Sequence, residues 1–423
     1  MIQRRIKDIA SIAVSNVDKK SAAGDLPVHL CNYVDVYNNE RITSDLPFME
    51  ATATPDQVRQ FHLRAGDVVV TKDSETPDDI AVPAYVAEEM PQVVCGYHLA
   101  IVRPRAGTHG RYLFWALSSN HARQQFSAMA NGITRFGLRH EALAAARVPL
   151  PELPVQRTIA DYLDAETARI DALISAKRWM VELLDERHAL AFTVAMATFG
   201  FTFPATLDPD WINITQPSGW RVMRLSQTLR QLTNGYVGPT RDILRGDGVH
   251  YIQSLHIKNG RIDFERRPFF VDADWHRARP RIHLRADDVV IVQTGDIGQV
   301  AVVPPGFGEA SCHALQIARV KPKVLSGKYL GAYLGSTFGR QSLLCRATGA
   351  LHPHLEGGIR DIPIAVPPRS VQEFVVREVE KEQEWAEEAR SLIERQVELL
   401  NEHRQALITA AVTGELEIPQ VAA

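Results

Sequence analysis

Carboxylates in one short stretch are the first residues of this 423-residue chain whose types could do chemistry. Asp67 and Asp73 flank a run of strand-forming residues, and Asp78 and Asp79 follow shortly afterwards. Grouped carboxylates can hold the magnesium ion of a self-contained DNA enzyme. Aspartates at strand ends also cap turns through hydrogen bonds to the backbone. We favour turn chemistry and keep a magnesium site near Asp67 and Asp73 as the alternative.

Histidines and cysteines give weaker metal signals. His352-Pro353-His354 could supply two ligands, but we find no set of neighbours that completes a metal site, which favours a loop contact. His98 and His313 are isolated among apolar residues, so we expect both in the core. The four cysteines are far apart and form no C-x-x-C pair, so we interpret them as buried free thiols. No metal and no cofactor is predicted.

Catalytic motifs for group transfer to DNA are missing. The sequence has no Asn/Asp-Pro-Pro-aromatic corner for a methyltransferase, no H-E-x-x-H and no G-x-S-x-G. Gly327-Lys328 lacks the leading glycine and the following hydroxyl of a nucleotide-binding phosphate loop. We therefore predict that the chain is not an enzyme.

Polar loops suit another kind of chemistry, contact with nucleic acid. Arg, Lys, Asn, Gln and Thr side chains are those that reach phosphates and base edges. Such residues concentrate in loops near 15–20, 71–74, 131–135 and 233–241, and near 277–281 and 293. The predicted DNA-contacting residues are Asn16, Lys19, Lys20, Lys72, Thr134, Arg135, Asn234, Tyr236, Thr240, Arg241, Arg279, Gln293 and His352.

A repeated helix is the element that must position these loops. The stretch from Val155 to about Ala197 has helical apolar spacing, and it recurs 216 residues later. Val155-Gln156 returns as Val371-Gln372, and the sequence Val-Glu-Leu-Leu at 181–184 returns at 397–400. A repeat of this length indicates architecture. At about 1.5 Å per residue, a helix of about 40 residues spans roughly 60 Å, too long to be buried in a small domain.

Both helices carry an apolar seam with spacings of three, four or seven residues. We therefore predict that they pair with each other as an antiparallel coiled coil. In the first helix the predicted seam is Ile159, Leu163, Ile170, Leu173, Met180, Leu184 and Ala191; in the second it is Val375, Val379, Ala386, Ile393, Leu400 and Leu407.

The segments before the helices repeat as well. Leu284–Val290 restates Leu63–Val69, and Tyr329-Leu330 restates Tyr112-Leu113. We expect strands over 28–36, 68–71 and 93–102 and a helix over 111–129. The fold class is therefore α+β, a tandem of two strand-rich units, each followed by a long helix. The predicted divisions are 1–153 and 215–369 for the two globular domains, 154–198 and 370–416 for the helices, 199–214 for a hinge and 417–423 for a tail.

Composition and charge bound the setting. No run of 18 apolar residues and no signal peptide is evident, so we expect a cytoplasmic protein without membrane contact. The net charge is −3 overall, but residues 198–370 carry 21 basic and 14 acidic residues, a net +7, whereas the two helices are acidic. A basic domain carried on acidic helices favours nucleic-acid binding. It argues against a third possibility, a coiled-coil scaffold with no DNA role.

The chain resembles the specificity subunit of type I restriction–modification systems. The residues that carry the resemblance are Gly66–Thr76, Val94–Leu99, Pro154–Ala160 and Leu407–Gly414, within a tandem layout that covers nearly the whole chain. Helices of that family usually begin with a Glu-Gln pair after prolines. Here Gln156 and Gln372 are present and the acid is not.

The resemblance implies a function and a set of partners. Two target-recognition domains would each read one part of a bipartite double-stranded DNA sequence. The helices would separate these domains and dock two methyltransferase subunits, in an assembly that also holds restriction/translocase subunits. The chain itself would be non-catalytic. The competing hypothesis is the magnesium-dependent DNA enzyme, which cleavage or methylation of DNA by this chain alone would support.

Overall fold

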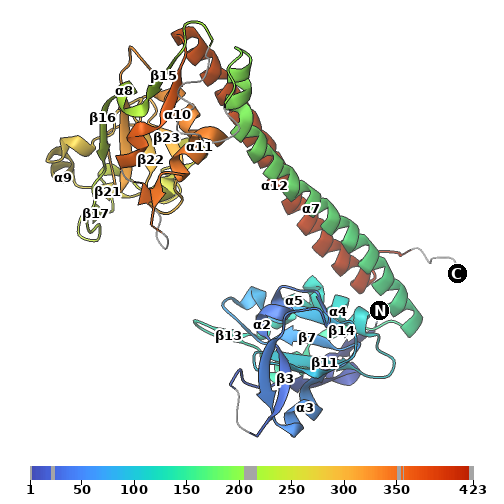
Figure 1. The fold of residues 1–423 in the computed structure, drawn as a ribbon. Helices are drawn as coiled ribbons and strands as arrows, with labels where there is room; N and C mark the ends of the chain where they lie inside the picture. The colour runs from blue at the N-terminus through green and yellow to red at the C-terminus, as the bar shows by residue number, and fades with distance from the viewer. Residues whose placement is uncertain (1, 21–23, 204–216, 350–353, 356, 419–423) are drawn as a thin grey trace. The chain divides into compact units, whose positions relative to one another are not determined.

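The computed structural model describes residues 2–20, 24–203, 217–349, 354–355 and 357–418, and these form two compact units. Unit 1 comprises residues 1–177 and 394–423, and unit 2 comprises residues 178–393. Each unit therefore contains one strand-rich body and one half of each long helix (Figure 1). Most of the predicted hinge (204–214) and the predicted contact His352 lie outside the described residues.

The body of unit 1 is built on two main sheets with strand orders β2-β11-β7-β9-β4 and β5-β3-β10-β6. Smaller sheets join β12, β13 and β8, and β1 with β14. The central strand β7 is completely buried because both of its faces are apolar. The strands are β1 Gln3–Arg5, β2 Ala10–Val14, β3 Leu26–Cys31, β4 Arg41–Ile42, β5 Met49–Ala53, β6 His62–Leu63, β7 Val68–Thr71, β8 Asp73–Ser74, β9 Pro83–Val86, β10 Met90–Cys95, β11 Leu99–Pro104, β12 Asn131–Gly132, β13 Phe136–Gly137 and β14 Arg147–Pro149.

Helices cover the β7 sheet of unit 1, with α4 packed against β7, β9 and β11 (Figure 1). Tyr112 on α4 is fully buried, and its hydroxyl donates a hydrogen bond to the Pro149 carbonyl, 2.8 Å away. The helices are α1 Ile6–Ile9, α2 Tyr33–Tyr37, α3 Pro55–Phe61, α4 Gly110–Ser118, α5 Asn120–Met129 and α6 His140–Ala145, with the 3-10 turn η1 at Pro77–Asp79.

Unit 2 repeats this plan. The order β16-β25-β22-β23 matches β2-β11-β7-β9, and the parallel pair β18–β24 matches the parallel pair β3–β10. The strands are β15 Arg221–Arg224, β16 Leu229–Asn234, β17 Leu244–Arg245, β18 Val249–Ile252, β19 Ile257–Lys258, β20 Arg261–Ile262, β21 Phe270–Val271, β22 Val289–Val292, β23 Val300–Val302, β24 Ala310–Cys312, β25 Leu315–Val320, β26 Ala347–Thr348, β27 His354–Leu355 and β28 Pro363–Val366.

The helices of unit 2 correspond to those of unit 1 where the sequence repeat is clearest. Helix α10 has nine residues, as α4 has, and begins 217 residues later. Tyr329 on α10 occupies the position of Tyr112 and donates to the Ala365 carbonyl at 2.9 Å. The short helices are α8 Leu225–Thr228, α9 Ala273–Arg277, α10 Gly327–Gly335 and α11 Thr337–Leu344, with 3-10 turns η3 Ser254–His256, η4 Pro280–Ile282 and η5 Gly357–Asp361.

The two long helices are α7, Leu153–Ala197, and α12, Arg369–Thr413, each of 45 residues. Their first and last residues are both separated by 216 positions, the offset found in the sequence. They pair in antiparallel fashion, because the partners of successive α7 residues run backwards along α12. In unit 1 Asp171 pairs with Arg404 at 3.0 Å, and in unit 2 Asp185 pairs with Arg390. The predicted α+β fold with paired long helices is confirmed.

The seam of α7 differs from the prediction at two positions. Leu173 and Met180 are 52% and 48% exposed, although we assigned both to the seam. Ile174 is buried at the pairing face instead, and Val181 is half-buried. At both places two apolar residues are adjacent, Leu173 with Ile174 and Met180 with Val181. Spacing alone selected the wrong member of each pair. The six predicted seam residues of α12 are buried or half-buried.

A buried glutamine holds the start of each long helix against its unit. The Gln156 side chain donates to the carbonyls of Gly107 and Pro151 at 3.0 and 2.8 Å, and accepts from the His109 N–H at 2.8 Å. Gln372 makes the equivalent bonds to Val324, Pro367 and Ser326. All three backbone groups would lose a buried partner without the amide. The repeated glutamine therefore has a structural role, because it ties the start of each long helix to the strand-rich body of its unit.

Local breaks correct three of the predicted elements. The strand expected over 28–36 ends at Cys31, because Asn32 and Asp35 form a capping box that starts α2. The run 93–102 is two strands separated by a turn at 96–98. The helix expected over 111–129 is broken at Ser119, which caps α5. No helix among the described residues has the length and apolar character needed to cross a membrane.

Candidate nucleic-acid interface

A buried ion pair fixes the start of the central strand in each unit. Asp67 is fully buried; its carboxylate accepts two hydrogen bonds from Arg103, both 2.7 Å, and one from the Arg64 N–H at 2.9 Å. In unit 2 Asp288 accepts equivalent bonds from Arg319 at 2.8 and 2.6 Å. A carboxylate that receives both forks of a guanidinium is held in one orientation. The loops at the other end of these strands are thereby mounted on a fixed support.

Residues 15–20, 72–74, 96–98 and 131–137 gather in unit 1, and we call them loop cluster 1. A backbone bridge joins Val17 to Gly96. The Lys72 N–H donates to the His98 carbonyl at 3.0 Å, and the Lys72 ammonium lies 4.4 Å from the centroid of the Tyr97 ring. Asn16 is exposed on the first of these loops and accepts a hydrogen bond from Gln57 at 3.1 Å. Lys72 and Asn16 therefore come from loops that lie side by side.

The hairpin of β12 and β13 completes loop cluster 1. Its strand β13 pairs with β8, next to Lys72, and the Leu138 N–H donates to the Lys72 carbonyl at 2.8 Å. Gly132 has φ of 153°, and a Cβ there would lie 1.9 Å from the Arg135 carbonyl oxygen, so the tight turn requires glycine. The tip presents Thr134 and Arg135 to solvent.

Arg135 also acts on the tyrosine beside the hairpin. Partial burial raises the pKa of Tyr33, and so does the Asp79 carboxylate, whereas Arg135 opposes this rise in pKa. The guanidinium is therefore near enough to the tyrosine to influence it electrostatically while remaining exposed. A cation in that position is available to a phosphate or to the edge of a guanine.

Residues 234–241, 275–281, 293–294 and 313 form loop cluster 2 in unit 2. Asn234 ends β16 opposite Gln316. The Gln316 side chain donates to the Leu355 carbonyl at 3.1 Å, and the Leu355 N–H donates to the Gln293 carbonyl at 2.9 Å. Asn234 and Gln293 are therefore connected through Gln316. Gln293 stands where Lys72 stands in unit 1, since Leu138 and Leu355 are also equivalent.

An aromatic group places Arg279 within loop cluster 2. The Arg279 guanidinium lies 4.3 Å from the centroid of the Trp275 ring and 5.9 Å from that of Tyr236, and it donates to the Trp275 carbonyl at 3.0 Å. Tyr236 meets Trp275 edge-on, with ring centroids 5.2 Å apart. A backbone bridge ties Tyr236 to His313. Arg279 is thus held by stacking more firmly than the freely exposed Arg135.

Four of the predicted contacts are exposed or half-exposed without a polar link to the others. Among the described residues, no hydrogen bond or ion pair joins the side chains of Lys19, Lys20, Thr240 or Arg241 to the remaining candidates. Lys19 and Lys20 continue the loop of Asn16, and Thr240 and Arg241 continue that of Tyr236. They belong to the clusters by sequence position only.

Two histidines and one cysteine differ from our expectations. His98 is one-third exposed, and its Nδ1 lies 2.7 Å from an Asp73 carboxylate oxygen, so it is not a core residue. His313 is half-buried and lies 3.2 Å from the Tyr251 hydroxyl; burial lowers its pKa. Both histidines follow strands that end at the loop clusters. Cys31, Cys95 and Cys312 are buried as predicted, but Cys345 is exposed.

The carboxylates of the alternative magnesium site have other partners. Asp67 is engaged by Arg103, and Asp73 by His98. Asp79 accepts a hydrogen bond from the Tyr37 hydroxyl at 2.8 Å, and Asp78 accepts one from Ser127 at 2.7 Å. In the part of the chain that the structure describes, no three His, Cys, Asp or Glu side chains are grouped to hold a metal ion. Only Asp67 also makes a turn contact, by accepting from the Arg64 N–H at 2.9 Å, so the turn interpretation applies to Asp67, whereas Asp73, Asp78 and Asp79 bind side chains.

Several residues of the clusters were not among our candidates. Tyr97 lies in the turn that we had taken as continuous strand, so its exposure was hidden by the misread run. Ile133 is 94% exposed at the hairpin tip, between Gly132 of β12 and Thr134. Trp275 supports Arg279. An isoleucine between a glycine and two polar residues was the one signal that could have identified a hairpin tip.

Comparison with known proteins finds relatives in sequence. No family model matches the chain. It is 25% identical over 305 residues to the EcoBI specificity subunit of a type I restriction enzyme from Escherichia coli, which covers 69% of this chain and 62% of that relative. The chain therefore spans less than two thirds of that relative's length. The StySPI specificity subunit from Salmonella potsdam is 20% identical over 402 residues, covering 92% and 82% of the two chains.

Solved structures share the fold. A chain in a structure on complex assembly and conformational transition of the type I restriction–modification system matches with a TM-score of 0.72 at 17% identity, covering 98% of both chains. The HsdS subunit from Thermoanaerobacter tengcongensis matches with a TM-score of 0.52 at 17% identity, covering 98% and 97%. The repeated strand-rich units and the paired 45-residue helices agree with these likenesses: in sequence and in fold, the chain is similar to the specificity subunits of type I restriction enzymes.

Proposed function

We propose that the chain is the non-catalytic subunit that recognises DNA for a type I restriction–modification complex in the cytoplasm. Loop cluster 1 reads one segment of a bipartite double-stranded target and loop cluster 2 reads the other. The long helices bind two methyltransferase subunits, and the assembly recruits restriction/translocase subunits. The divisions at 1–153 and 215–369 are the proposed limits of the two reading domains.

One observation carries this proposal: the same support is built twice and ends in different side chains. Asp67–Arg103 and Asp288–Arg319 fix equivalent strands. Beyond them stand Lys72 and Tyr97 in unit 1, and Gln293 and Trp275-stacked Arg279 in unit 2. Sequence is read by hydrogen bonds and apolar contacts to base edges, so two different loop sets suit two different DNA segments.

Exposed apolar residues on the long helices support the docking of protein partners. In unit 2 these are Trp179, Met180, Leu183, Leu190, Val194, Trp385 and Leu392; in unit 1 they are Val155, Leu173 and Leu399. Contiguous apolar surface on a soluble chain marks an interaction site when it is larger than scattered single residues. The helix spacing of 180, 183, 190 and 194 places four of them on one face.

Exchange of one reading domain tests the proposal. When residues 1–150 are replaced by the equivalent unit of a relative and the chimera is co-expressed with its methyltransferase, methylome sequencing is expected to show one half of the target changed and the other retained. A change in both halves, or methylation by the chain without a methyltransferase, would contradict a modular, non-catalytic reader. The reciprocal exchange of 215–369 is the matched control, because it should change the opposite half.

Arg135→Ala is expected to weaken DNA binding by about 1–3 kcal/mol if the guanidinium reads a guanine, with relaxed specificity at one position. If Arg135 contacts only phosphate, binding should weaken evenly across sequences and depend less on salt. Titration of labelled duplexes at two salt concentrations distinguishes the two. Arg169→Ala, an exposed arginine on α7 paired with Glu166, is the control and should leave binding unchanged. Unchanged affinity for Arg135→Ala would remove it from the interface.

A further inference from the structure

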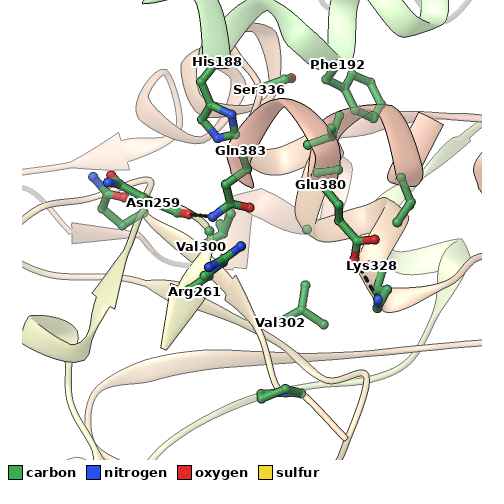
Figure 2. A pocket seen from close by; sticks show the side chains of 18 of the residues that line it. His188, Phe192, Asn259, Arg261, Val300, Val302, Lys328, Ser336, Glu380 and Gln383 are labelled. Atoms are coloured by element: carbon green, nitrogen blue, oxygen red, sulfur yellow. Dashed lines mark hydrogen bonds and ion pairs between the residues drawn. The ribbon is translucent and has the colours of Figure 1, made fainter. Parts of the chain in front are cut away.

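One cavity of unit 2, of about 530 Å³, has polar groups in its lining that the chain already pairs with one another (Figure 2). The Lys328 ammonium lies 2.7 Å from a Glu380 carboxylate oxygen, and the Gln383 side chain donates to the Asn259 carbonyl at 2.6 Å. Val300 on its apolar side is only 2% exposed. A ligand at Glu380 or Gln383 would have to displace a partner within the chain. Unit 1, in contrast, exposes an apolar side chain that the chain does not cover.

That side chain is Ile133, at the tip of the β12–β13 hairpin. It is 94% exposed, more than any other large apolar side chain in the part of the chain that the structure describes. Thr134 and Arg135, which follow it, are exposed as well, and so are the two residues before it. An aliphatic group in water forgoes the favourable free energy of burial, so a partner that covers Ile133 gains that free energy.

The hairpin fixes the place of Ile133. Gly132 pairs with Phe136 across the hairpin, so the turn contains only the three residues between them. Strand β13 pairs with β8 on its other side, and the β8 residue Asp73 is held by His98, whose Nδ1 lies 2.7 Å from its carboxylate. A side chain on a turn supported in this way is positioned before a partner arrives, which lowers the entropic cost of binding.

The surroundings of Ile133 favour DNA over protein as that partner. Protein partners bind contiguous apolar patches, whereas the hairpin tip offers one aliphatic side chain among polar ones. Thr134, Arg135 and Lys72 are of the types that contact phosphates and base edges. Lys72 lies beside the hairpin, since its carbonyl accepts from the Leu138 N–H at 2.8 Å. A lone apolar group among such residues fits a base edge that carries one apolar group.

The width of a β-hairpin selects the groove of the DNA. Neighbouring strands lie about 4.8 Å apart even before side chains are added. The minor groove of B-DNA is about 6 Å wide, whereas the major groove is about 12 Å wide and admits a two-stranded ribbon. In the major groove, the apolar group that the base edges present is the C5 methyl group of thymine. A hairpin that enters this groove tip first brings Ile133 to that methyl group.

We propose that Ile133 is a specificity-determining residue that reads a thymine in the target segment of loop cluster 1, by packing against the C5 methyl group of that base. The inference rests on the proposed function, because loop cluster 1 must lie on DNA for the contact to form. Cytosine lacks the methyl group, so the contact distinguishes T·A from C·G. Arg135, two residues further along the same turn, is left to contact a neighbouring base pair or phosphate.

Uracil substitution in the DNA tests this contact. The full chain in complex with its methyltransferase is titrated with duplexes that carry the target found by methylome sequencing. In the segment assigned to unit 1 by domain exchange, each thymine is replaced in turn by deoxyuridine, which lacks only the C5 methyl group. We expect replacement at one position to weaken binding about fourfold, the effect of one buried methyl group. A scrambled duplex reports whether binding is specific.

Failure of the contact and failure of the proposed function give different results. If target and scrambled duplexes bind equally, the proposed function is wrong and the contact is wrong with it. If the target is preferred but its segment contains no thymine, or no thymine responds to uracil, the contact alone is refuted.

Replacement of the responsive T·A pair gives a second readout. A pair of 5-methylcytosine with guanine should bind about fourfold more tightly than the unmethylated C·G pair, because it restores the methyl group in the major groove. Equal affinity for these two duplexes would overturn the assignment of Ile133 to the methyl group.

Three variants assign the methyl effect to one side chain. Ile133→Ala should bind the thymine and uracil duplexes equally, whereas Ile133→Val keeps a branched aliphatic group and should keep the difference. Ile2→Ala is the matched control, because Ile2 is 65% exposed in unit 1 and lies outside loop cluster 1; it should also keep the fourfold difference. A difference that survives Ile133→Ala assigns the methyl group to another side chain and refutes the proposal.

A fluorescent base separates reading of the methyl group from insertion between bases. Aliphatic side chains can also wedge into a base step from the minor groove and unstack it. With 2-aminopurine next to the responsive thymine, the parent chain and Ile133→Ala should give the same fluorescence on binding. An increase that the parent chain shows and Ile133→Ala lacks would indicate a wedge and overturn the major-groove contact.

Discussion

Replacing Asp67 by asparagine is expected to lower the free energy of unfolding of unit 1 by about 3–5 kcal/mol. Asp67 is 1% exposed and neutralises Arg103 through two hydrogen bonds, while Arg103 also donates to the His62 carbonyl. The substitution removes one charge of a buried pair and leaves the other without compensation. A loss of this size is a large part of the 5–15 kcal/mol that typically stabilises a domain.

Hydrogen exchange measured by mass spectrometry can follow this loss separately in each unit. Peptides from β7 and β11 should lose protection in the Asp67→Asn variant, whereas peptides from β22 and β25 should keep it. Asp288→Asn should give the mirrored result, because Asp288 and Arg319 make the same contacts in unit 2. Asp8→Asn breaks an exposed pair with Arg5 and should change protection little. Unaltered exchange in β7 would show that the pair contributes nothing to the stability of unit 1.

Insertion of four residues after both Arg178 and Glu394 is expected to lengthen the unread DNA between the two target segments by one or two base pairs. Four helical residues add about 6 Å, and one base pair adds about 3.4 Å. Asp171 faces Arg404 and Asp185 faces Arg390, so the midpoint of the pairing lies close to these two insertion sites. Four residues are close to one turn of 3.6, so the seam stays nearly in phase and both loop clusters remain intact.

Methylome sequencing of cells that carry the double insertion reads the target directly. Both specified segments should be unchanged, with only the spacer longer. A matched control inserts two residues at each site, which turns the following helix by about 200° and moves the apolar seam away from its partner; this variant should lose methylation. Full methylation with the original spacer in the four-residue variant would falsify the idea that the helices determine the spacing.

The repeat made the large features of the fold predictable. Because the offset of 216 holds without a gap, the two long helices could be located from one another, and the structure places both ends of each helix at that same offset. The tandem α+β plan followed from the recurrence of Leu63–Val69 as Leu284–Val290. The repeat could not decide which side of each long helix faces its partner helix. Leu173 and Met180 satisfy the seam spacing as well as their neighbours do, and only the partner helix selects Ile174 instead.

Short-range side-chain contacts explain the remaining errors in the elements. Asn32 and Asp35 cap a helix inside a run of strand formers, so a local hydrogen-bond pair outweighs β propensity. Ser119 interrupts an otherwise helical stretch in the same way. Spacing rules treat such residues as ordinary polar positions, although each satisfies backbone groups that would otherwise be unpaired.

For the loops, the sequence showed which residue types are present, but it did not show which loops lie close together. Arg135 was selected because it follows a glycine in a polar loop, and the hairpin tip does expose it. That Lys72 would lie over Tyr97, or Arg279 over Trp275, depends on strand pairings between residues far apart in sequence. The same is true of Trp115 and Asp164, which are 49 residues apart in sequence and are joined by a hydrogen bond. No local sequence pattern predicts these side-chain contacts.

The buried glutamines and Asp–Arg pairs have a consequence for how such a chain can evolve. Gln156, Gln372 and the two Asp–Arg pairs make their hydrogen bonds to groups inside their own units. Their substitution carries a stability penalty whichever DNA is bound, while residues at the loop tips carry almost none. Under the proposed function, selection for a new DNA target can therefore act on the loop tips of one unit without disturbing the support beneath them. Under this proposal the loop-tip residues can change often, whereas the buried glutamines and Asp–Arg pairs can change only rarely.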